Sequence, residues 1–120
     1  MTLYQLKCVA CQGDTPRMTA REINERLPEV PDLQVIEEDN IPRLQRVFKF
    51  KDFSQALEFT NRVGEVAEKE EHHPLIMTEW GRVTLRWWTH KIHGLHLNDF
   101  IMAARSDQLY EAQKRVVNRE

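Results

Sequence analysis

The switch from helical to extended patterning at Pro74 constrains the fold of this chain most. Over residues 53–70, apolar side chains recur at the three- and four-residue spacing of one helix face, and Asp52 stands before them as an N-cap. Proline disfavours the helical conformation of the residue before it, so the helix must end near His72 and His73 must be extended. A long helix and a strand are therefore joined at a conformationally restricted junction.

The other segments follow the same two periodicities. Thr19 and Glu22 have capping-box spacing, and Pro28 ends the short helix that they predict. Strands are expected at 33–38, 44–51, 75–80 and 82–90, and a last helix from Leu97 to about residue 117. The order α-β-β-α-β-β-α predicts an α+β fold, in which a four-stranded, mostly antiparallel sheet carries helices on one face.

The length of 120 residues leaves room for one compact domain. Residues 1–18 are polar and contain Gly13 and Pro16, so we expect an N-terminal arm or loop followed by a single domain over 19–120. Gly64 lies inside the long helix, where glycine costs up to about 1 kcal/mol relative to alanine. We expect it to mark a position of close packing.

Charge and hydropathy exclude several classes of ligand. The net charge of -2 provides no basic surplus for phosphates, so direct nucleic-acid binding is disfavoured. Basic side chains are interspersed along the second strand, at Arg43, Arg46, Lys49 and Lys51, and are expected on a solvated edge or face. No apolar stretch approaches the roughly 20 residues of a membrane span, and the first residues lack a signal-peptide layout, so we expect a cytoplasmic protein.

The histidines around the helix-to-strand junction are the main candidates for chemistry. His72 and His73 are adjacent on an extended backbone, so their side chains point apart and suit two different tasks around one ligand. Glu68 lies one helical turn before His72, and His90 ends the predicted hairpin, where it can approach the pair. Histidine both donates and accepts protons near neutral pH, which favours acid–base chemistry.

Two other interpretations of these histidines stay open. Adjacent histidines at a junction also serve as capping or packing residues. A metal site is the second alternative, since His90, His93 and His96 form H-x-x-H-x-x-H, and Cys8 and Cys11 form C-x-x-C. However, a helical three-residue spacing turns successive imidazoles by about 60°, so one ion is hard to share. We therefore expect no bound metal.

The residues of this region resemble the pterin-4a-carbinolamine dehydratase family. The resemblance covers residues 40–105 and is carried by a set of short motifs. These are Glu68, Glu71-His72-His73-Pro74, Thr89-His90, Gly94-Leu95 and Asn98-Asp99. Within the family, the sequence is similar to the bacterial form associated with phenylalanine hydroxylase.

The resemblance implies a reaction and a mode of assembly. Members of this family remove water from 4a-hydroxytetrahydrobiopterin to give quinonoid dihydropterin, which is recycled for phenylalanine hydroxylation, and they use no metal or organic cofactor. They have a four-stranded α+β fold and form homodimers or homotetramers. A phenylalanine hydroxylase is then a possible partner. The alternative function is an oligomeric interaction module that stabilises or regulates a hydroxylase or a transcription factor.

The resemblance also implies roles for individual residues. His72, His73 and His90 match the three catalytic histidines: His72 and His90 would handle protons, and His73 would hydrogen-bond the ring. Glu68 would orient an imidazole or hold the pterin amide edge. The remaining substrate-binding residues implied by the resemblance are Glu71, Trp88, Thr89 and Lys91.

Overall fold

The computed structural model describes the backbone of residues 1–10 and 12–119 and has the predicted order of elements. The helices are α1 (Ala20–Arg26), α2 (Phe53–Glu70) and α3 (Leu97–Arg119), and the strands are β1 (Gln34–Glu38), β2 (Ile41–Lys49), β3 (Leu75–Glu79) and β4 (Arg82–Trp87). Short 3-10 turns cover Leu3–Gln5, Leu27–Glu29 and His90–Ile92.

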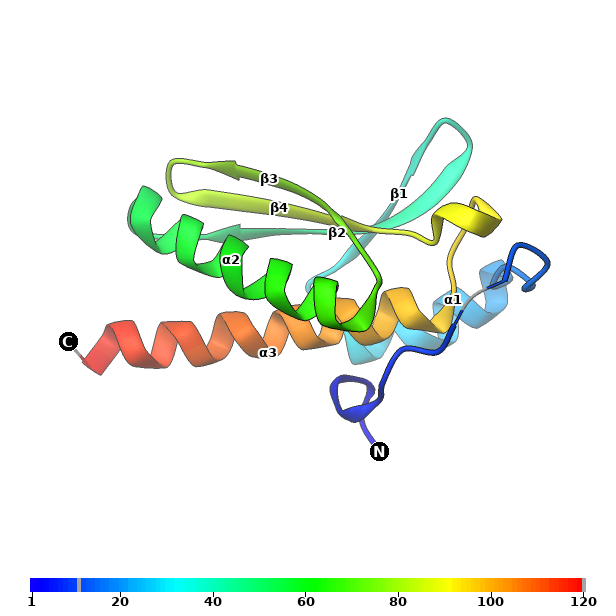
Figure 1. Ribbon diagram of the computed structural model, residues 1–120, viewed down its shortest axis with the longest axis horizontal. Helices are drawn as coiled ribbons and strands as arrows, with labels where there is room; N and C mark the ends of the chain where they lie inside the picture. The colour runs from blue at the N-terminus through cyan, green and yellow to red at the C-terminus, as the bar shows by residue number, and fades with distance from the viewer. Residues whose placement is uncertain (11, 120) are drawn as a thin grey trace.

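The four strands form one sheet in the order β1-β2-β4-β3, and all three pairings are antiparallel. The hairpin between β1 and β2 turns at Asp39 and Asn40, whose φ angles of 54° and 64° suit a tight two-residue loop. The sheet lies above the helices in Figure 1, with α2 and α3 packed against the same face. The predicted α+β fold is confirmed.

Helix α2 begins and ends at residues that the sequence indicates. The Asp52 carboxylate accepts a hydrogen bond from the Gln55 backbone N–H at 2.8 Å, which caps the first turn. The helix ends where Glu71 adopts a left-handed conformation with a φ of 54°. The N–H of His72 then bonds the carbonyl of Ala67 at 3.1 Å, so the final turn closes before Pro74 and the chain enters β3.

The fourth strand is shorter than predicted. It ends at Trp87 instead of continuing to His90, because Thr89 forms an isolated bridge with Gly94 that closes a loop. His90 therefore lies in a 3-10 turn. Trp87 is buried in the core, while Trp88, just beyond the strand, is only partly buried.

Two basic residues of β2 are not solvated, contrary to the expectation. Arg43 is 7% exposed, and its guanidinium lies 4.0 Å from the ring centroid of Trp88. Arg46 pairs with Asp107 at 2.7 Å and lies over the ring of Phe48. Aromatic rings and a carboxylate from α3 replace water around these guanidinium groups, which a strand pattern by itself does not reveal.

The expectation of close packing at Gly64 is also wrong, because a Cβ atom added there would meet no atom within 4 Å. The N-terminal arm is anchored through Leu3, which is buried although most described arm residues are exposed, and Figure 1 shows this dark blue segment beside α3. None of the helices in the described part of the chain is long and apolar enough to cross a membrane.

Candidate active site

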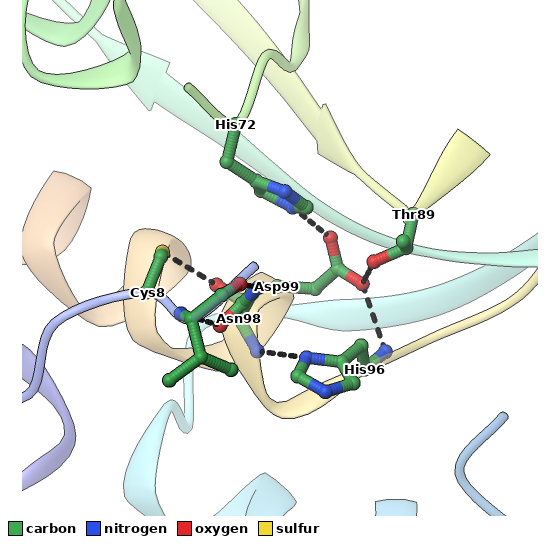
Figure 2. Close-up of polar contacts among 7 residues, drawn as sticks. Cys8, His72, Thr89, His96, Asn98 and Asp99 are labelled. Atoms are coloured by element: carbon green, nitrogen blue, oxygen red, sulfur yellow. Dashed lines mark hydrogen bonds and ion pairs between the residues drawn. The ribbon is translucent and has the colours of Figure 1, made fainter. Parts of the chain in front are cut away.

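A buried carboxylate links three segments at the end of the sheet. Asp99 is fully buried in the first turn of α3. Its Oδ1 atom lies 2.6 Å from Nε2 of His72, and its Oδ2 atom accepts hydrogen bonds from the Thr89 hydroxyl at 2.8 Å and the His96 backbone N–H at 2.9 Å. Figure 2 shows both side chains meeting this carboxylate, His72 from the connection between α2 and β3 and Thr89 from the loop after β4.

The bond to Asp99 fixes the orientation of His72. A carboxylate oxygen accepts, so the hydrogen bond places a proton on Nε2 and leaves Nδ1 as the acceptor of the neutral ring. The ring also lies nearly parallel to Trp87, with an interplanar angle of 3° and centroids 6.1 Å apart. A histidine held in this way is oriented to take a proton at Nδ1, and the carboxylate stabilises the resulting cation.

The other two histidines are held more loosely. Nε2 of His73 lies 3.3 Å from a carboxylate oxygen of Glu68, and both side chains are exposed. The ring of His90 packs against Trp88 with centroids 4.5 Å apart, and Arg43 lies on the same indole. Exposed polar contacts add little to stability, so the contact between Glu68 and His73 orients the ring more than it stabilises the fold.

The three histidines line one cavity of about 490 Å³. Four segments build it: the α2–β3 junction, the loop after β4, the N-terminal arm and the start of α3. Its described lining residues are Cys8, Val9, Ala10, Gln12, Lys69, Glu70, Glu71, His72, His73, Thr89, His90, Lys91 and Asn98. This volume suits a single small heterocycle.

Six of the eight residues predicted for the site line this cavity, and two do not. Glu68 and Trp88 lie outside it, and each contacts a histidine of the lining instead, His73 and His90 respectively. The structure thus brings together His72, His73, His90, Glu71, Thr89 and Lys91 around one space.

Three residues at the site, Asp99, Asn98 and Cys8, are not among the predicted catalytic or substrate-binding residues. The spacing of Asp99 from His96 is the signal that was available, since an acidic residue at the third helical position often bonds back to the N–H before the helix. The contacts of Asn98 and Cys8 join positions about 90 residues apart and have no local signal.

The environment of the Cys8 thiol disfavours its ionisation. Burial, reinforced by the nearby negative charge of Glu70, raises the pKa of Cys8 to about 12, so the thiol stays protonated at neutral pH. Within the described residues, no three His, Cys, Asp or Glu side chains are grouped so that they could hold a metal ion.

Comparison with known proteins places the chain in a family. A sequence profile described as pterin 4 alpha carbinolamine dehydratase matches residues 16–109. Two curated bacterial relatives have the provisional name pterin-4-alpha-carbinolamine dehydratase. The one from Nitrosococcus oceani is 57% identical over 89% of this chain and 95% of its own length. The one from Marinobacter nauticus is 56% identical over 90% of this chain and 97% of its own length.

Two solved structures have the same fold as this chain. A Brucella melitensis protein described as a transcriptional coactivator/pterin dehydratase superposes with a TM-score of 0.72 and 34% identity, covering 79% of this chain and 99% of that one. A pterin dehydratase-like protein described as a RuBisCO assembly factor shares the fold, with a TM-score of 0.56 and 21% identity over 66% of this chain and 89% of that one. The profile match and these relatives show that the chain belongs to the pterin-4a-carbinolamine dehydratase family.

Proposed function

We propose that this protein is a 4a-hydroxytetrahydrobiopterin dehydratase, a lyase that forms quinonoid dihydropterin and water. The observation that carries the proposal is the convergence of His72, His73 and His90 on one cavity, in a chain of this family. The reaction is a redox-neutral elimination, so proton transfer between positioned side chains suffices and no cofactor takes part.

The proposed mechanism assigns the base to His72 and the acid to His90. His72 takes the proton from N5 on its Nδ1 atom, with Asp99 stabilising the imidazolium. The electron pair of the broken N5–H bond forms the C4a=N5 double bond, and the C4a–O bond breaks. His90 donates its proton to the departing hydroxyl, which leaves as water, so the enzyme gains one proton and loses one.

The other predicted residues bind the substrate or support the histidines. His73, oriented by Glu68, hydrogen-bonds the pterin ring. Glu71, Thr89 and Lys91 form part of the cavity wall, and Trp88 supports the ring of His90 from behind. Planar heterocycles with amide and amino edges are recognised by such convergent polar groups.

The proposal includes a cellular setting. The protein would work in the cytoplasm as a homodimer or homotetramer, and it would regenerate the pterin used by a phenylalanine hydroxylase, which is a candidate partner. The bacterial relatives with the same family name support the reaction class.

The test follows the decay of chemically generated 4a-hydroxytetrahydropterin with wild type and with three variants, His72→Ala, His73→Ala and His90→Ala. In His72→Ala and His90→Ala, which remove the proposed proton-transfer groups, the enzymatic rate is expected to fall by about 100-fold or more. The control is His93→Asn, because His93 is exposed, lies outside the cavity lining, and has a φ of 53° that asparagine tolerates. Wild-type decay no faster than the uncatalysed rate refutes the proposal.

One observation favours a second function, an oligomeric interaction module, since the Brucella melitensis relative is described as a transcriptional coactivator as well as a pterin dehydratase. As a module, the protein would stabilise or regulate a hydroxylase or a transcription factor. Co-purification of such a partner would then survive replacement of all three histidines. A partner lost together with the histidines contradicts the module function.

A further inference from the structure

The side chain of Asn98 fastens the N-terminal arm to the active site. Its Oδ1 atom accepts a hydrogen bond from the Val9 backbone N–H at 3.0 Å, and its Nδ2 atom donates to the Val9 carbonyl at 2.7 Å. Asn98 is only 2% exposed and precedes Asp99 directly. Figure 2 shows these bonds next to the carboxylate that holds His72. The amide thus satisfies both backbone groups of one arm residue, as a neighbouring strand would.

A second contact fixes the arm closer to its start. The guanidinium of Arg105, on α3, donates to the Leu6 carbonyl at 2.6 Å and to a carboxylate oxygen of Glu70 at 2.6 Å. It therefore joins the arm to both α2 and α3. Charge-assisted hydrogen bonds of this kind are about twice as strong as neutral ones, and Leu3 adds an apolar anchor in the core. The arm is therefore held at Leu3, Leu6 and Val9.

The docked arm contributes an uncharged wall to the cavity. Cys8, Val9 and Ala10 line the cavity together with the three histidines. Val9 is 62% exposed and Ala10 is exposed, so they stand at the rim, whereas Asn98 beneath them is buried. The Cys8 thiol stays neutral, because its pKa is raised to about 12. This wall therefore suits an apolar or neutral part of a ligand.

We propose that Val9 and Ala10 contact the substituent at C6 of the pterin and select for it, with Asn98 as the positioning residue. This inference rests on the function proposed above. In the dehydration, C4a and N5 must face the histidines. C6 is bonded to N5, so its substituent lies beside the reacting edge, and Val9 and Ala10 are exposed residues that line the same cavity as the histidines. The family profile matches residues 16–109, so the three wall residues precede the matched region.

The first experiment releases the arm with Asn98→Ala in a Cys11→Ser background, where Cys8 is the remaining thiol. The substrates are 4a-hydroxytetrahydropterins with a dihydroxypropyl or a methyl group at C6. For the dihydroxypropyl substrate KM is expected to rise about fivefold, a loss of about 1 kcal/mol of binding. For the methyl substrate the rise stays below about twofold, and kcat changes less than about twofold for both.

Alkylation of Cys8 by iodoacetamide reports arm release independently of activity. The thiol is expected to react at least about tenfold faster in Asn98→Ala, because undocking restores its hydration and lowers its pKa. The matched control is Asn61→Ala, since Asn61 is an exposed asparagine of α2 outside the cavity lining. It is expected to leave both the alkylation rate and KM unchanged.

Ala10→Trp tests the wall while the Asn98 contact stays in place. The larger side chain is expected to raise KM for the dihydroxypropyl substrate at least about fivefold more than for the methyl substrate. The inference is overturned if wild type is active, Asn98→Ala releases Cys8, and the KM values of both substrates nevertheless change equally. An inactive wild-type protein refutes the proposed function instead, so the two failures are distinguishable.

Discussion

Nε2 of His72 lies 2.6 Å from Oδ1 of Asp99, and this carboxylate is fully buried. The same carboxylate accepts a hydrogen bond from the Thr89 hydroxyl, so it joins the connection between α2 and β3 to the loop that follows β4. A buried carboxylate that loses its hydrogen-bond donors costs free energy. The contacts of Asp99 are therefore kept, and the cluster is a rigid support for the candidate base.

Replacing this carboxylate with an amide is expected to slow the reaction without unfolding the protein. Asp99→Asn keeps the shape but can turn an N–H₂ group toward His72, which favours the wrong imidazole tautomer. The value of kcat in the dehydration assay should fall by about 100-fold or more, with KM changed less.

The control for this variant is Thr89→Ser, which keeps the hydroxyl that donates to Asp99 and should retain kcat within about threefold. Circular dichroism of both variants checks that the fold persists. An Asp99→Asn protein with wild-type kcat contradicts the role of Asp99 in orienting the base.

Local patterns predict the elements of this fold well. The caps at Thr19 and Asp52 and the restricted junction before Pro74 are set by residues within three or four positions of each other. The two adjacent histidines are likewise a local feature, and the sheet topology brings His90 to the same cavity.

The missed features depend on contacts between distant segments. Trp88 and Asp107, which belong to other elements, cover the guanidinium groups of Arg43 and Arg46. The sequence predicts a loosely organised arm because its anchors, Asn98 and Arg105, lie 89 and 99 residues away from the arm residues they bind. No hydrophobic period encodes a hydrogen bond from a side chain to a remote backbone, so these contacts require the tertiary structure.

Removing the N-cap of α2 is expected to lower the stability of the protein without changing its activity. Asp52→Ala leaves the Gln55 N–H without its 2.8 Å partner and should lower the free energy of unfolding by about 1 kcal/mol, measured by urea denaturation. Asp52 is absent from the cavity lining, so kcat and KM at 25 °C should stay at wild-type values.

The matched control is Asp14→Ala, because Asp14 is an exposed aspartate outside the helices. Its effect on the free energy of unfolding should stay within about 0.5 kcal/mol. A cost for Asp52→Ala no larger than that of this control contradicts the capping role.

The Cys8 thiol is expected to resist alkylation in the folded protein. Its pKa is raised from 9.0 to about 12, so at pH 8 the folded chain holds far less thiolate than the unfolded chain. In a Cys11→Ser chain, iodoacetamide should react at least about 100-fold more slowly in buffer than in guanidinium chloride. Similar rates in the two solvents contradict the shielding of Cys8.

The same pKa shift predicts a loss of stability at alkaline pH. The folded-state pKa of Cys8 lies above the unfolded value, so its contribution is fully present below pH 9.0 and is lost as the pH rises toward 12. Thermal unfolding from pH 8 to 10.5 should show a steeper decline for the Cys11→Ser chain than for one that also has Cys8→Ala. Parallel declines would exclude Cys8 as the group responsible.

Gly64 offers a route to a more stable protein. It lies inside α2, and a Cβ atom there would meet nothing within 4 Å. Gly64→Ala removes conformational freedom from the unfolded chain without creating a clash, so the free energy of unfolding should rise by about 0.5–1 kcal/mol.

Gly81 is the matched control for this substitution. Its φ of 74° and the Phe50 carbonyl 3.2 Å from its would-be Cβ make Gly81→Ala strained. That variant should lose stability by about 1 kcal/mol or more. Urea denaturation of both variants measures the sign of each change in the free energy of unfolding. A destabilised Gly64→Ala chain would mean that this face of α2 packs against something in solution, for which an assembled homo-oligomer is the first candidate to examine by sedimentation.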